Sequence, residues 1–224
     1  MRKILLKEAK EHMKYLCESL TDRHVGSIQN KKAGEYIFNV LNNSNATLVK
    51  VKKFNCFDWK PLDVSLIVDN NYYEAYISPY SSSTKIEASL CIASNLEELK
   101  NVDGKGKIVL LTDDLCKEQL VHKNFPFYNI DEHKEIIKLL ENKGFKAVIT
   151  ATGKDENTAG GMYPFPLIED GDFELPSIYI KDKIGEELKK KVNKTVKIVI
   201  KTHKEESSGM NVIADFNNEV ENKI

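Results

Sequence analysis

The sequence predicts an α+β protein, and three features carry this prediction. Two amphipathic helices and a strand open the chain, over about residues 5–20, 33–41 and 47–52. A series of short strand-forming segments follows between residues 64 and 93. A strand, a helix and a second strand between residues 107 and 150 then have the form of a parallel crossover.

The opening helices are predicted by apolar residues that recur every three or four positions. In the first helix this spacing begins at Leu5 and ends at Leu20, so we expect the helix to end near Asp22. Turn residues around Gly26 separate it from the second helix. Alternating residues over 47–52 then indicate a half-buried strand.

The middle of the chain is rich in strand-forming residues. Turn residues separate the segments 64–68, 72–77 and 86–93, so we expect hairpins there. The continuous apolar run at 107–111 is typical of a strand that is buried on both faces, and residues 147–150 form a similar run.

Helix 131–142 is predicted to lie between these two buried strands. We expect Asp131 to cap its amino terminus and Gly144 to end it. A second short helix is expected to begin with Asp182 as its cap and to end at Lys190. Residues 152–176 are predicted to form a long loop.

Three further strands complete the predicted order. They cover residues 177–180, 196–200 and 211–216.

Charge and hydropathy exclude several classes of protein. The chain has 224 residues, with 33 Lys and Arg against 34 Asp and Glu, so a dedicated nucleic-acid binder is not expected. No apolar run approaches the roughly 20 residues that cross a bilayer, so no membrane partner is expected either. The first residues lack the apolar core of a signal peptide, and a cytoplasmic location is therefore predicted.

Residues with metal-binding or catalytic chemistry are scattered. The four cysteines form no Cys-x-x-Cys pair and are interpreted as single buried thiols. The five histidines are expected to stand alone, except for surface pairs of His133 with Asp131 and of His12 with Glu8. We therefore predict no metal site and no catalytic residues in this chain.

The order of several segments resembles one enzyme family. Residues 12–16, 20–27 and 31–37 resemble the beginning of the dizinc aminopeptidases, which include bacterial leucyl aminopeptidases, glutamate carboxypeptidases and the inactive transferrin receptor. The middle, with Gly104–Leu110, Gly144–Ile149 and Leu175–Ile180, looks like the protease-associated domain that many members carry as an insertion. Ser208–Ala214 is similar to the strand that re-enters the peptidase domain.

This resemblance implies three segments. Residues 1–56 would be part of a peptidase domain, residues 57–205 a β-rich protease-associated domain, and residues 206–224 the return strand. The fold class would then be an α+β protease-associated domain with flanking helices, inserted in an incomplete α/β zinc-aminopeptidase domain.

The resemblance also shows what is missing. The family's zinc ligands are a His-x-Asp after the next strand, a Glu-Glu pair, an acidic residue and a distal His, and none has a counterpart here. Glu205-Glu206 is not that pair, because it precedes Asn211. We therefore expect an amino-terminal, non-catalytic portion that is inactive alone, with zinc in the full-length relative and a His-x-Asp soon after residue 224.

The resemblance implies partners as well. They are the remainder of the peptidase domain and, in the parent enzyme, a peptide substrate; a homodimer is an open alternative. The protease-associated domain would act as a lid or an assembly element at the active-site mouth. Its candidate rim residues are Tyr163 and Phe165 as apolar contacts and Asp172 as a polar one. Alternatively, the two aromatic residues fill the domain's own core.

Two other readings remain open. The chain could be a complete, non-enzymatic protease-associated module that mediates protein interaction, or a sugar- or nucleotide-binding α/β domain, although it has no phosphate loop. The first two hypotheses differ in their surfaces. If residues 1–56 belong to a larger domain, the apolar stripes of both helices lack their partner and are exposed, swapped or buried in a dimer. Arg23 is assigned to structure, as a tie between the first helix and the loop at Gly26.

Overall fold

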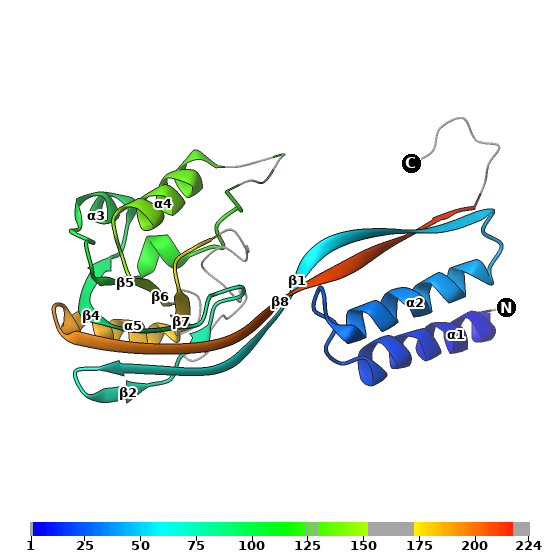
Figure 1. Cartoon of the computed structure of the whole chain (residues 1–224), viewed down its shortest axis with the longest axis horizontal. Coiled ribbons are helices and arrows are strands. Elements are labelled where there is room, and N and C mark those ends of the chain that lie inside the picture. The colour runs from blue at the N-terminus through cyan, green and yellow to red at the C-terminus, as the bar shows by residue number, and fades with distance from the viewer. Residues whose placement is uncertain (1, 124, 126, 128–129, 152–172, 217–224) are drawn as a thin grey trace. The chain divides into compact units, whose positions relative to one another are not determined.

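A computed structural model describes residues 2–123, 125, 127, 130–151 and 173–216. It confirms the α+β class, because helices accompany one mixed sheet with the strand order β2-β1-β8-β4-β5-β6-β7-β3 (Figure 1). The chain forms two compact units. Residues 1–59 and 204–224 make up unit 1, and residues 60–203 make up unit 2.

Unit 1 contains two helices and parts of two strands. Helix α1 (Arg2–Lys14) continues into a π-helical turn (Tyr15–Ser19), and α2 (Ile28–Asn42) follows a short loop. The first half of β1 (Leu48–Val68) and the second half of β8 (Thr195–Asp215) lie beside each other in this unit. The predicted order of helix, helix and strand is confirmed.

Strands β1 and β8 are longer than the sequence indicates. Each has 21 residues, so the predicted strands 47–52 and 64–68 are parts of one strand, as are 196–200 and 211–216. Both strands run through residues that usually interrupt strands, such as Pro61. Hydrogen bonding between the two strands, which are neighbours in the sheet, overrides these local signals.

Unit 2 is a largely parallel sheet with helices on both faces. The parallel strands are β4 (Thr84–Ala93), β5 (Ile108–Leu111), β6 (Ala147–Ala151) and β7 (Ser177–Ile180). Helix α4 (Asp131–Asn142) connects β5 to β6, which confirms the predicted parallel crossover. Short antiparallel strands β2 (Asn71–Tyr73) and β3 (Tyr76–Ile77) stand at the two ends of the strand order.

The hydrophobic core lies in unit 2. On one face of its sheet, α3 (Leu96–Asn101) and α4 pack against Val109, Leu111 and Val148. On the other face, α5 (Asp182–Leu188) packs closely through Gly185 against Ala151. No helix in the described part of the chain is long and apolar enough to cross a membrane.

Three helix predictions need correction. Helix α3 was not predicted; it begins at the Asn95 side chain, which accepts a hydrogen bond from the Glu98 N–H. Asp131 and Asp182 do not cap their helices. They are the first residues of α4 and α5, and the capping positions belong to Ile130 and Lys181, which make no side-chain cap. Gly144 ends α4 with a positive φ of 75°, as predicted.

Candidate functional site

A cluster of polar contacts in the described part of unit 1 lies in the loop between the π-helical turn and α2. Ser27 is the amino-terminal cap of α2: its Oγ accepts a hydrogen bond from the Asn30 N–H at 3.0 Å. The same hydroxyl donates to the Asp22 carbonyl at 3.2 Å. The cap therefore fixes both the start of α2 and the start of the loop.

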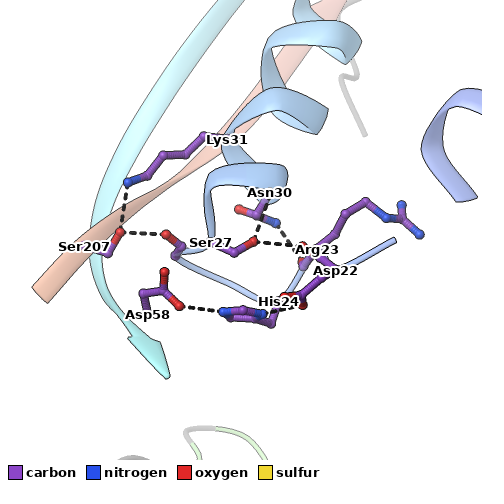
Figure 2. Close-up of polar contacts among 9 residues, drawn as sticks. Asp22, Arg23, His24, Ser27, Asn30, Lys31, Asp58 and Ser207 are labelled. Atoms are coloured by element: carbon purple, nitrogen blue, oxygen red, sulfur yellow. Dashed lines mark hydrogen bonds and ion pairs between the residues drawn. The ribbon is translucent and has the colours of Figure 1, made fainter. Parts of the chain in front are cut away.

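His24 lies between two carboxylates (Figure 2). Its Nδ1 is 2.6 Å from Asp22 Oδ1, and its Nε2 is 2.6 Å from Asp58 Oδ1 on β1. Asp58 is buried, with 7% of its surface exposed. His24 thus connects the loop to the strand.

The electrostatics of this cluster favour a charged imidazole. Partial burial of His24 by itself lowers its pKa, but hydrogen bonds to Asp58 and Asp22, together with their negative charges, outweigh burial. The pKa of His24 is therefore raised above its usual value of 6.5.

Further bonds hold the loop against α2 and β8. The Asn30 side chain donates to the Arg23 carbonyl at 3.2 Å. Ser207 on β8 donates to the Gly26 carbonyl at 2.7 Å and accepts a bond from the Lys31 ammonium at 2.9 Å. Figure 2 shows these contacts converging on one short loop.

A cleft of about 610 Å³ lies next to the loop, within unit 1. Arg23 and Asn30 form its polar side, and Met210 belongs to its β8 side. The complete lining is Thr21, Arg23, Asn30, Ala33, Gly34, Ile37, Met210, Asn211 and Val212.

The cluster is suited to holding the loop, not to acid–base or metal chemistry. Both ring nitrogens of His24 already contact carboxylate oxygens, so neither is available to take a substrate's proton. A zinc ligand needs a free nitrogen lone pair directed at the metal, so zinc does not fit here. Across the described residues, no group of three or more His, Cys, Asp or Glu side chains is arranged to hold a metal ion.

The histidine pairs that the sequence suggested are replaced by others. His12 contacts the Tyr36 hydroxyl at 2.7 Å instead of Glu8. His133 is buried; it accepts a hydrogen bond from the Val121 N–H at 3.1 Å and lies 3.4 Å from Glu118. The expectation that His24 stands alone is wrong, although Asp22, two residues before it, was the available signal.

The predicted rim residues Tyr163, Phe165 and Asp172 lie outside the described residues. The Arg23 carbonyl accepts a hydrogen bond from the Asn30 side chain, so the described contact of Arg23 ties the loop to α2 and not, as expected, to the first helix. Its guanidinium is directed away from His24 (Figure 2).

Comparisons with known proteins give a likeness in structure only. No protein-family model and no curated protein matches the chain by sequence. An aminopeptidase from Aneurinibacillus sp. strain AM-1 matches with a TM-score of 0.62 at 20% identity, over 91% of this chain and 47% of its own. A zinc aminopeptidase from Bacillus subtilis matches with a TM-score of 0.61 at 22% identity, over 93% and 46%.

A third solved structure agrees with these two. It is a peptidase M28 precursor from Shewanella amazonensis SB2B, with a TM-score of 0.59 at 16% identity, over 96% of this chain and 54% of its own. The chain spans about half the length of these structures. Its fold is therefore similar to that of about half of a zinc aminopeptidase.

Proposed function

We propose that the chain is the amino-terminal, non-catalytic portion of a zinc-dependent aminopeptidase-like metallopeptidase. In this proposal unit 1 is the incomplete peptidase domain and unit 2 is the protease-associated domain. The similarity in fold to aminopeptidases over about half of their length supports it.

The observation that carries the proposal is the near absence of a core in unit 1. Among the described residues, Leu20 and Ala33 are the only buried hydrophobic residues outside unit 2. Two such residues bury too little apolar surface to stabilise a unit of this size by itself. Unit 1 therefore needs further protein to cover it.

The apolar residues that this further protein would bury are exposed on every helix and strand of unit 1. Large apolar side chains face solvent on both helices and on both strands. They are Leu5, Leu6, Met13, Ile28, Ile37, Leu48, Val51, Phe54, Phe57 and Ile213. A complete binding module would bury such residues or present them as one partner-binding patch, so their spread over all four elements favours the incomplete domain.

The lid role is the finer part of the proposal. Its support is that unit 2 has its own core, with helices on both faces of its sheet, and so can fold as an inserted domain. In this role Tyr163, Phe165 and Asp172 would contact a peptide substrate of the assembled enzyme. The zinc ligands would come from the remainder of the peptidase domain.

The first experiment measures zinc content and hydrolysis. We expect the purified chain to bind no stoichiometric zinc and to cleave no aminoacyl p-nitroanilide. Hydrolysis that a chelator abolishes would contradict the proposal.

The second experiment tests the uncovered surface. A dye whose fluorescence increases when it binds exposed apolar surface should bind the chain. The double variant Leu6→Gln, Ile28→Gln should reduce this fluorescence, because both side chains are exposed in unit 1. Val192→Gln, which replaces one of the exposed apolar residues of unit 2, is the control and should leave the fluorescence nearly unchanged. A monodisperse monomer that does not bind the dye would favour the complete module.

A further inference from the structure

A pocket of about 430 Å³ lies in unit 2, between strands from opposite sides of the sheet. Its walls are residues 61–64 of β1, residues 75–77 in and before β3, and Tyr179 of β7. In the strand order, β3 stands at one end and β1 is next to the other end. The sheet of unit 2 therefore curves until these two strands approach each other across the pocket.

The outer edge of β3 has no strand beside it in the described chain. On its inner side β3 pairs with β7, with Ile77 opposite Ile178. The next residue, Ser78, donates its N–H to the Ser177 carbonyl at 3.2 Å. Hydrogen-bonded and non-hydrogen-bonded pairs alternate along antiparallel strands, so the Ile77 pair is a non-hydrogen-bonded one. The N–H and C=O of Ile77 therefore point away from β7, toward the open edge.

These two backbone groups lie where a hydrogen-bonding partner is needed. Only 8% of Ile77 is exposed, and backbone groups that are withdrawn from water are nearly always hydrogen-bonded in proteins. The facing edge of β1 is open too, because β2 pairs only with Leu66–Val68 and leaves residues 61–64 uncovered on that side. An extended peptide between the two strands can bond to Ile77 as an added strand.

The side chains around the pocket favour an aromatic group. Tyr76 and Tyr179 are directly opposite each other in the β3–β7 pair, and their rings stack with centroids 5.3 Å apart at an angle of 22°. Pro61 and Leu62 add an aliphatic wall, and Leu62 is 65% exposed. Aromatic rings attract a further ring in offset or edge-to-face contacts.

The charges near the pocket do not favour a charged side chain. Asp63, which lines the pocket, lies 2.8 Å from the Lys201 ammonium. Glu74, which precedes the lining residues of β3, lies 2.6 Å from the Lys181 ammonium. Each carboxylate thus has a cation of its own. A neutral side chain enters the pocket without separating these pairs.

We propose that the pocket between β1 and β3 binds an extended peptide segment of another polypeptide. The segment adds as a strand to the outer edge of β3 and places a neutral aromatic side chain against the Tyr76–Tyr179 stack. Because β3 has only two residues, this side chain supplies much of the affinity. The proposal does not depend on the aminopeptidase assignment, since all its residues belong to unit 2 and no step needs zinc or hydrolysis.

The experiment is an NMR titration of the full chain with the peptide acetyl-Ser-Thr-Phe-Thr-Ser-amide. At saturation, hydrogen exchange of the Ile77 amide should slow by about fivefold, because its N–H gains an acceptor. The Ser78 amide is the matched control. Its N–H is already bonded to the Ser177 carbonyl, so its exchange should stay nearly unchanged.

Three modified peptides separate the side chain from the added strand. Alanine in place of phenylalanine should weaken binding about tenfold, because the apolar surface of the ring is no longer buried. Methylation of both threonine nitrogens removes backbone donors and keeps the side chains, so binding should weaken about fivefold. Lysine in place of phenylalanine should also bind less tightly than the original peptide.

Three variants test the ring stack. Tyr76→Leu keeps an apolar side chain but removes one ring, so the preference for phenylalanine over alanine should fall to about threefold. Tyr76→Phe loses only the hydroxyl, which donates to Glu74 at 2.5 Å, and should keep the preference. Tyr72→Leu is the control. It replaces a ring on β2 that is 79% exposed and is not part of the pocket lining, so binding should not change.

The proposal is overturned if the phenylalanine peptide does not bind, or if the alanine or the methylated peptide binds as tightly. Unchanged exchange of the Ile77 amide at saturation would contradict the added strand, and tighter binding of the lysine peptide would contradict the neutral pocket. If Tyr76→Leu does not fold, the comparison of the four peptides on the wild-type chain still decides the question.

Discussion

Gly26 lies directly against the backbone of Phe57, so that a Cβ at Gly26 would be 2.6 Å from the Phe57 carbonyl oxygen. Gly26 also has a φ of +89°, a backbone conformation that residues other than glycine rarely adopt. The contact brings the loop that carries His24 close to β1, where Asp58 follows Phe57. Glycine at this position is therefore a condition for the His24–Asp58 contact.

Replacing Gly26 by Ala should destabilise unit 1 severely. The expected loss in free energy of unfolding is about 3 kcal/mol. The left-handed backbone conformation costs alanine about 1 kcal/mol, and overpacking against the β1 backbone costs roughly 2 kcal/mol. Urea unfolding followed by the fluorescence of Trp59, the chain's single tryptophan, measures it. Gly106→Ala is the matched control: φ is +72°, nothing lies within 4 Å of the added Cβ, and about 1 kcal/mol should be lost.

Leu110 should be among the most sensitive positions of unit 2. It is 0% exposed in the central strand β5, so Leu110→Ala removes buried apolar surface and leaves a cavity. The expected loss is about 2–5 kcal/mol in the free energy of unfolding, measured by circular dichroism in urea. Leu62→Ala, at a site that is 65% exposed, should change stability by less than about 0.5 kcal/mol. Equal losses in the two variants would contradict the placement of the core.

The four cysteines should react in two groups. Burial raises the pKa of Cys91 to about 11, and it raises that of Cys116 well above its ordinary value. At pH 8 very little of either thiol is the reactive thiolate. Cys17 is exposed and Cys56 is half-buried, so iodoacetamide should modify these two first. Mass spectrometry identifies the modified peptides, and rapid modification of Cys116 in the folded chain would contradict its burial.

Elements whose signals are local could be predicted from the sequence. Helix α4 was predicted over its observed range of 131–142, and Gly144 marked its termination, although Asp131 is the first residue of the helix and not its cap. The apolar runs of β5 and β6 identified strands that are buried on both faces. These elements follow from residues that are neighbours in the chain.

Features that depend on distant residues could not be predicted in this way. The length of β1 and β8 depends on their pairing with each other. The His24 cluster depends on Asp58, which is 34 positions away. Spacing within the loop could have suggested Asp22 as a partner, but nothing local indicates that a buried carboxylate of β1 reaches the other ring nitrogen.

The pairing of β1 with β8 also sets an order of folding. At one end of this pair, the Thr47 N–H donates to the Asp215 carbonyl, 168 positions away, and both residues belong to unit 1. Closing so long a chain segment costs conformational entropy, and the cost falls once the intervening residues 60–203 have become compact. During synthesis, unit 2 should therefore fold before the first 59 residues can pair with the carboxyl-terminal half of β8.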